Sequence, residues 1–195
     1  MLDAALGRLD AEALARDVAA LVRVPSVMGD ERAALERLGE LAGALGLEPD
    51  LHRHDLAALR AHPDHPGEEA PRSELYGLTV TVPGTRADGP RLAIDGHVDV
   101  VPPGSVPWAH GGPWSGAVAG GFVHGRGSVD MKGSVVRVAG VPWGADMRLW
   151  CARGIPCVMA GPPGIALAHA VDERAAVADL VTVARVIVRV VFGLA

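Results

Sequence analysis

The chain has 195 residues, 49% of them hydrophobic, and a formal net charge of −5. This length suits one domain with a single buried core, and the hydrophobic fraction excludes an intrinsically disordered chain. The charged residues are interspersed without a basic stripe, which argues against a nucleic-acid partner.

Two amphipathic helices are predicted near the N-terminus. The first begins after Asp10, a residue type favoured as a helix N-cap, and ends before Pro25. The second extends from about Asp30 to Leu45, and Gly46 is its predicted C-terminal stop. In both segments apolar residues recur at helical spacing, which is typical of a helix that buries one face.

Three short strands are predicted further along, at residues 76–82, 91–101 and 155–159. Residues 48–71 show no regular pattern. Residues 102–127 are rich in glycine, proline and tryptophan, and we expect them to form one long loop beside a functional site. Helices followed by strands, loops and a last helix indicate an α/β fold with a mixed or parallel sheet.

The last segment, residues 175–195, is apolar apart from Asp179, Arg185 and Arg189. A membrane-spanning helix is the alternative here, but central charges are costly in a membrane, so we expect a core-packed helix and no membrane contact. Residues 1–10 lack a basic region followed by an apolar one, so no secretion signal is predicted. We therefore expect a cytoplasmic protein.

The first candidate site residues are His97 and Asp99. Alternate side chains of a strand project to the same face, so both are expected to point together at the carboxyl end of the predicted strand, where α/β sheets place ligands. A metal-bound imidazole commonly donates its other N–H group to a carboxylate, a role that suits Asp99. The alternative is an ordinary surface His-x-Asp pair.

A second candidate is Asp130, which lies between Gly127 and Gly133. The glycines permit a tight turn that aims the carboxylate inward, and a carboxylate can bridge two metal ions. The alternative role is to cap a helix that begins at Met131, and one residue can fill both roles.

A third candidate is His169, which lies in an apolar run that ends at Asp172 and Glu173. A histidine in this setting suits a metal ligand on a loop. For the two acidic residues we expect a capping role, with Asp172 as the N-cap of the last helix and Glu173 in its first turn, where the helix dipole favours it.

Four stretches together resemble the zinc-dependent family of aminoacylases, acetylornithine deacetylases, succinyl-diaminopimelate desuccinylases and carboxypeptidase-G-type peptidases. They are residues 21–27, 97–99, 125–133 and 144–173, and they occur in the family's order. The resemblance implies a three-layer α/β/α fold with a mixed, mainly parallel sheet, as an incomplete version of the family's catalytic domain.

The resemblance also implies roles for single residues. His97 looks like the histidine ligand of one zinc ion, and Asp99 looks like its hydrogen-bonded catalytic partner. Asp130 looks like the bridging carboxylate, which a cis peptide bond often follows, and His169 looks like the histidine of the second zinc. Cobalt or manganese are alternatives to zinc. Three further residues are candidates for binding the substrate's carboxylate: Arg148, Gly161 and Gly164.

The sequence departs from the family pattern after Asp130. The family has a Glu-Glu pair there, which supplies the general base and one zinc ligand, and then a further acidic ligand and a dimerisation domain. Residues 131–145 contain no acidic residue, so residues 1–195 resemble a single, internally shortened catalytic domain joined near 134–141, and no family-type dimer is expected. Each zinc would keep two protein ligands, where three are usual. The acidic residues that could substitute are Asp146, Asp172 and Glu173.

The leading hypothesis is a metal-dependent hydrolase of the amide bond of an N-acyl amino acid or small peptide. The missing general base normally contributes about 10²- to 10⁴-fold to the rate, so the alternative is a non-catalytic remnant or a weak metal-binding structural domain.

Trp108 and Trp114 either wall a substrate pocket or pack a loop onto the core. A histidine-rich stretch without regular spacing is predicted to be a solvated loop rather than a second metal site. Its histidines are His52, His54, His62 and His65.

Overall fold

The structure is a computed structural model, and it describes residues 1–68, 70–83, 92–135, 150–151, 153–155, 157 and 165–194. Most of the strand predicted at 155–159 and of the junction predicted near 134–141 lies outside these residues. The three candidates for binding the substrate's carboxylate also lie outside them: Arg148, Gly161 and Gly164.

Helices α2 (Ala11–Val22) and α3 (Arg32–Ala44) confirm the two predicted N-terminal helices. The Asp10 carboxylate caps α2 by accepting hydrogen bonds from two backbone N–H groups of its first turn, at 2.8 and 3.1 Å. After α3 the chain turns at Gly46, whose φ of +78° is a left-handed conformation that glycine adopts without strain. Both helices begin and end close to where the local sequence indicates.

The first sheet pairs β1 (Pro49–Arg53) with β2 (Tyr76–Val80) in antiparallel register. The second strand confirms the prediction at 76–82. The first strand and the short helix α4 (Leu56–Arg60) lie where the sequence shows no regular pattern. Helix α3 packs on this sheet and shares a small hydrophobic core with it. The buried members of this core are Ala34, Leu35 and Val98.

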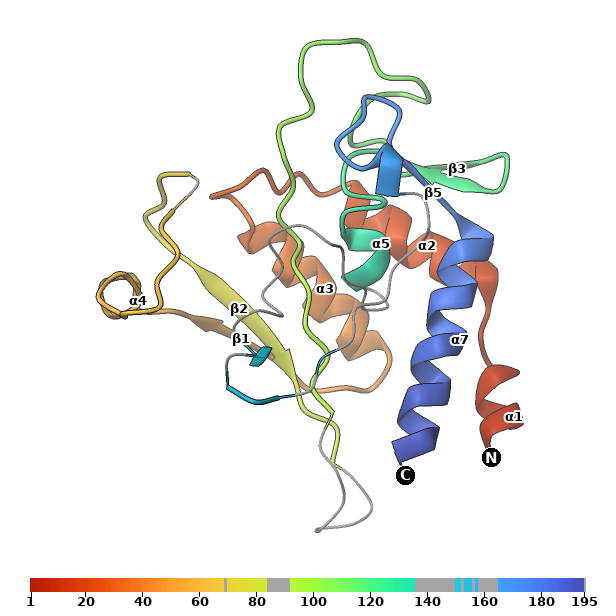
Figure 1. Cartoon of the computed structure of the whole chain (residues 1–195). Helices are drawn as coiled ribbons and strands as arrows, with labels where there is room; N and C mark the ends of the chain where they lie inside the picture. The colour runs from red at the N-terminus through yellow and green to blue at the C-terminus, as the bar shows by residue number, and fades with distance from the viewer. Residues whose placement is uncertain are drawn as a thin grey trace.

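The strand predicted at 91–101 is wrong for the part of this range that the structure describes. Only Val100 pairs there, in an isolated parallel bridge with Val27. Leu92 and Ile94 are each 47% exposed, so the apolar positions that favour a strand are only partly covered. Figure 1 shows this segment as an extended trace through the middle of the molecule. Strand-favouring residues indicate an extended chain, but they do not specify a hydrogen-bonding partner.

A second antiparallel sheet has the strand order β3–β4–β5, with β3 at Ala117–Ala119, β4 at Phe122–His124 and β5 at Arg174–Ala176. Two of its strands form a hairpin within residues 102–127, so the prediction of one long loop is wrong there. The third strand brings a late part of the chain beside this hairpin, with Val123 opposite Ala175.

Both described sheets are therefore small and antiparallel. The expected three-layer arrangement about one mainly parallel sheet is wrong for the described residues, whereas their mixed content of helices and strands agrees with an α/β class. A parallel sheet needs several long strands joined by crossover connections. One expected strand makes only a single bridge, and another lies mostly outside the described residues.

Helix α7 (Val177–Leu194) confirms the predicted last helix and packs against α2 and against α1 (Leu2–Leu6). Figure 1 shows α7 and α1 at one side of the molecule and the β1–β2 sheet at the other. None of the described helices is both long enough and apolar enough to span a membrane. The main hydrophobic core lies between α2, α7 and the second sheet, and includes Ala15, Val18, Ala19, Val22, Val123, Val129, Ala175 and Leu180.

Candidate metal centre

Three segments meet at the candidate site: the extended chain at His97, the turn at Asp130 and the loop at His169. The Asp130 carboxylate lies between the two imidazoles. Its Oδ1 is 3.3 Å from His97 Nε2, and its Oδ2 is 3.1 Å from His169 Nε2. Each oxygen of one carboxylate thus faces a different imidazole, which is the arrangement that a bridging ligand requires.

Asp99 contacts the other nitrogen of the His97 ring. The Nδ1 atom of His97 lies 3.2 Å from Asp99 Oδ1 and 3.1 Å from the backbone carbonyl oxygen of Asp99. Burial disfavours a charged ring, but hydrogen bonds to Asp130 and Asp99 prevail and raise the pKa of His97 to about 10. The hydrogen bond from His97 is in turn the main reason why the pKa of Asp130 is lowered. Asp130 is therefore held as an anion.

The backbone beneath His97 is fixed by the segment that follows α2. The Ser26 hydroxyl is fully buried and donates a hydrogen bond of 2.6 Å to the carbonyl oxygen of Val98. The Val100 N–H group donates to the Ser26 carbonyl oxygen at 2.9 Å, and the Met28 N–H group donates to the Val100 carbonyl oxygen at 3.2 Å. These bonds replace the sheet that was expected to position His97.

The turn that carries Asp130 depends on glycine. Gly127 has a φ of +84°, and a Cβ atom there would lie 2.6 Å from Val100 Cγ1. The peptide bond between Asp130 and Met131 is cis, as the resemblance implies. The short helix α5 (Lys132–Val135) follows. The segment at Val100 and the Asp130 turn can therefore approach closely only without a side chain at position 127.

Lys132 ties the Asp130 turn to the N-terminal part of the chain. This residue, the only lysine in the sequence, is fully buried. Its ammonium group donates a hydrogen bond of 2.6 Å to the carbonyl oxygen of Val24 and lies 5.6 Å from the centre of the Trp114 ring. Burial lowers the pKa of Lys132 to about 8. The bond to Val24 connects the turn with the stretch that contains Ser26.

The two tryptophans pack against buried cations. Trp114 faces Lys132, and the Arg126 guanidinium lies 4.9 Å from the centre of the Trp108 ring. The Trp108 indole N–H group donates to the carbonyl oxygen of Pro103 at 3.1 Å. These contacts support the packing role rather than a pocket wall.

His169 lies on the loop after the 3₁₀-helix η1 (Ile165–Leu167), and its side chain is 56% exposed. Its φ of +65° is left-handed, a conformation uncommon outside glycine but enriched among histidines. The loop ends at β5, which directs the chain back into the second sheet. His169 thus reaches Asp130 from a surface loop.

The predicted capping roles of Asp172 and Glu173 are wrong, because β5 separates them from α7, which begins at Val177. Glu173 is fully buried and forms an ion pair with Arg126 at 2.7 Å. The sequence analysis missed both partners of this pair. The local sequence carries no signal of this burial, because the charged residues Asp172 and Arg174 flank Glu173. Only the fold shows that a cation and hydrogen-bond donors satisfy this buried carboxylate.

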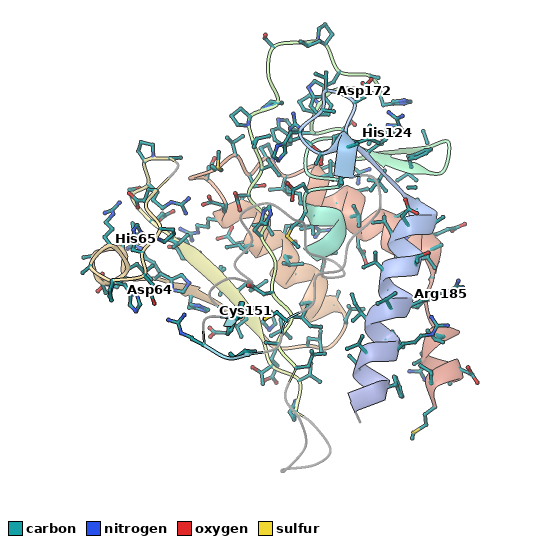
Figure 2. The ribbon with its side chains drawn as sticks, in the orientation of Figure 1. Asp64, His65, His124, Cys151, Asp172 and Arg185 are labelled. Carbon is teal, nitrogen blue, oxygen red and sulfur yellow. The ribbon has the colours of Figure 1, made fainter. Side chains whose placement is uncertain are left out.

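The histidine-rich stretch takes no part in the cluster. His52 and His54 contact each other, with ring centres 4.8 Å apart. Figure 2 shows Asp64 and His65 beside α4, far from Asp172 on the loop that follows His169. The prediction of a solvated loop agrees with the exposure of His62 and Asp64, but it is wrong for His52, which lies on strand β1.

The chemistry and spacing of the central residues suit divalent metal ions. Two ligands bound at about 2.0–2.1 Å to one tetrahedral ion lie about 3.3 Å apart. The Asp130–His97 and Asp130–His169 separations of 3.3 and 3.1 Å match that spacing, with one imidazole nitrogen and one carboxylate oxygen in each pair. Within the described ranges, no group of three or more His, Cys, Asp or Glu residues is arranged to hold one ion. Each ion would thus have two described protein ligands.

Comparisons with known proteins relate these motifs to a family. The family model described as peptidase family M20/M25/M40 matches residues 93–141, which include His97, Asp99 and Asp130. The matched part of the chain is similar to this peptidase family. A succinyl-diaminopimelate desuccinylase of Nitrobacter hamburgensis is 40% identical over 127 residues, which is 65% of this chain and 28% of the relative. Another, of Methylorubrum extorquens, is 34% identical over 164 residues, which is 84% of this chain and 33% of the relative.

A third relative with the same name, from a Methylobacterium species, is 41% identical over 120 residues, or 61% of this chain and 26% of the relative. The chain therefore spans between about a quarter and a third of the length of these relatives. The aligned regions cover most of this chain but only a minor part of each relative. Residues that lie elsewhere in the relatives have no counterpart in these alignments.

Proposed function

We propose that this chain forms part of a two-metal centre for hydrolysis of the amide bond of an N-acyl amino acid or small peptide. The observation that carries the proposal is the Asp130 carboxylate, whose two oxygens lie 3.3 and 3.1 Å from the imidazoles of His97 and His169. Similarity to a peptidase family and relatives named as desuccinylases support hydrolysis as the reaction class.

In the proposed centre, His97 and Asp130 hold one ion, and His169 and Asp130 hold the other. Zinc is the proposed metal, since imidazole and carboxylate are among its usual ligands, and cobalt or manganese are alternatives. A bound metal pair would polarise the substrate's carbonyl group and activate water. Asp99 orients His97 by accepting a hydrogen bond from Nδ1, which leaves Nε2 directed at Asp130.

The proposed substrate class follows from the relatives. They are named as succinyl-diaminopimelate desuccinylases, so an N-succinyl derivative of a diamino dicarboxylic acid is the first substrate to test. Arg148 and the glycines at 161 and 164 stay the proposed contacts of the substrate's carboxylate.

None of the residues that the structure describes is an evident general base. Residues 131–145 contain neither aspartate nor glutamate, and Glu173, near the cluster, is engaged with Arg126. Without a base we expect hydrolysis to be slower by about 10²- to 10⁴-fold than at a complete centre. This absence favours a second candidate function, a non-catalytic metal-binding domain. It also supports our proposal of one internally shortened catalytic domain with a junction near residues 134–141.

Metal content and turnover distinguish the two candidates. The chain is equilibrated with zinc, its metal content is determined, and hydrolysis of N-succinyl-diaminopimelate is followed with and without a chelator. Bound zinc with slow, chelator-sensitive hydrolysis supports the hydrolase, whereas bound zinc without hydrolysis supports the metal-binding domain. A chain that binds no zinc at micromolar concentration contradicts both.

A further inference from the structure

The buried polar residues of the described chain gather beneath the candidate centre. Two of them carry opposite charges and pair directly: Arg126 Nη1 lies 2.7 Å from Glu173 Oε2, with side chains 3% and 0% exposed. Burying two charges is costly unless their remaining hydrogen-bonding groups are also satisfied. The other partners of this pair therefore indicate its role. Within the ranges that the structure describes, the buried polar residues are Ser26, Arg126, Ser128, Lys132 and Glu173.

Glu173 holds the backbone that carries Asp130. Its Oε1 atom accepts hydrogen bonds from the N–H groups of Val129 and Asp130, at 3.0 and 3.1 Å. The second oxygen faces Arg126, so both carboxylate oxygens are used. One of the two amides belongs to Asp130, the proposed bridging ligand. Glu173 therefore fixes the backbone from which the Asp130 side chain extends.

Arg126 holds the backbone that carries His169. Its Nη1 atom donates to the carbonyl oxygen of Ala170 at 3.2 Å, and its Nη2 atom donates to the carbonyl oxygen of His169 at 3.3 Å. The planar guanidinium group suits this task because it presents several donors in a fixed geometry. Stacking on Trp108 fixes its plane further.

The two contacts are reciprocal. Arg126 belongs to the turn of Asp130 but binds the loop of His169, whereas Glu173 belongs to the loop of His169 but binds the turn of Asp130. The pair therefore links the two backbone segments directly beside the two ligands.

We infer that Arg126 and Glu173 are a pair of positioning residues that set the separation between Asp130 and His169. The inference deepens the proposed function, because that separation governs whether one ion can bind both side chains. A partner that orients a metal ligand typically changes metal affinity by about 10- to 100-fold. The direct test of the pair itself needs no metal, because the two segments are linked in the metal-free chain.

The test compares Glu173→Gln with the wild-type chain and with a control, Glu36→Gln, which removes an exposed carboxylate paired to Arg32 at 2.8 Å. NMR of the metal-free chain measures amide hydrogen exchange at Val129 and Asp130 and the ring nitrogen shifts of His169. Glu173→Gln is expected to speed exchange at both amides and to shift the His169 ring signals. The control is expected to change neither readout.

Arg126→Lys provides a second variant if the first does not fold. A lysine keeps a positive charge opposite Glu173 but cannot present the same fork to two carbonyl groups. We expect His169 ring signals to shift while the Val129 and Asp130 amides stay protected. A merely structural pair would instead lower stability to urea and leave the His169 ring signals unchanged in the folded protein, which would overturn the inference.

Zinc affinity completes the test. Competition with a chromophoric chelator is expected to show an affinity lower by about 10- to 100-fold in Glu173→Gln and unchanged in Glu36→Gln. Equal affinity in wild type and Glu173→Gln overturns the inference. A wild-type chain that binds no zinc contradicts the proposed function, and the NMR readout then decides the positioning role by itself.

Discussion

Two regions of this chain are rich in histidine and acidic residues, and only one of them converges. In the first, His52 on β1 contacts His54 just after this strand, while Asp64 and His65 lie beside α4 (Figure 2). In the second, His97, Asp130 and His169 come from distant parts of the sequence and meet at 3.1 to 3.3 Å. Local density of metal-binding side chains is therefore a poor guide to a metal centre.

The two regions differ in how the backbone that carries their side chains is supported. The histidine-rich stretch is mostly exposed and rests on a two-stranded sheet. The second region stands on buried polar residues that bind the backbone of neighbouring segments: Ser26 holds Val98, and Lys132 holds Val24. A metal centre needs ligands fixed to within a fraction of an ångström, and such support provides that precision.

Loss of the shared Asp130 carboxylate should have the largest effect on zinc binding. Asp130→Asn keeps the shape of the side chain but replaces one anionic oxygen with an amide group, so it can no longer serve two ions. We expect zinc affinity to fall by more than about 100-fold, beyond the loss of about 10- to 100-fold typical of an outer partner. Competition with a chelator measures this. Affinity that stays near the wild-type value would show that Asp130 does not bridge.

Weakening the support beneath His97 should have a smaller effect. Ser26→Ala removes a hydroxyl and leaves the buried carbonyl oxygen of Val98 without its 2.6 Å hydrogen bond. We expect the free energy of unfolding to fall by about 1–3 kcal/mol, as is typical when a buried polar group loses its partner. Urea denaturation measures this, and zinc titration is expected to show weaker binding as well. Ser73→Ala, on an exposed loop, is the matched control.

Removing the first histidine pair should have the smallest effect. The double variant His52→Ala/His54→Ala deletes two imidazoles, one on β1 and one just after it, that contact each other, whereas Asp130 contacts His97 and His169. We expect zinc stoichiometry and affinity at the proposed centre to stay unchanged, as measured by the same titration. Loss of a tightly bound zinc ion in this variant would show that zinc binds at His52 and His54, and would contradict the proposed centre at Asp130.

Short-range features of the fold could be predicted from the sequence. The cap at Asp10 and the turn at Gly46 act on their own neighbours, so a few residues specify them. The spacing of His97 and Asp99 places them close together even though the expected strand makes only one bridge, because an extended chain alone keeps positions two apart near one another. The glycines around Asp130 likewise indicate a tight turn.

Long-range pairing could not be predicted in the same way. The apolar residues at 91–101 favour a strand, but the observed partner is a single residue, Val27, whose own sequence carries no strand pattern. Glu173 resembles a helix-capping residue by its neighbours, and only its burial against Arg126 reveals another role. Both errors arise because pairing and burial depend on segments far away in the sequence.

The central claim is that the Asp130 carboxylate serves two ions, one with His97 and one with His169. Equilibrium dialysis against micromolar zinc followed by elemental analysis tests it most directly, with wild type and His97→Ala measured side by side. The account predicts two zinc ions for the wild-type chain and one for His97→Ala. Equal zinc content in both chains, or none in the wild type, would contradict it.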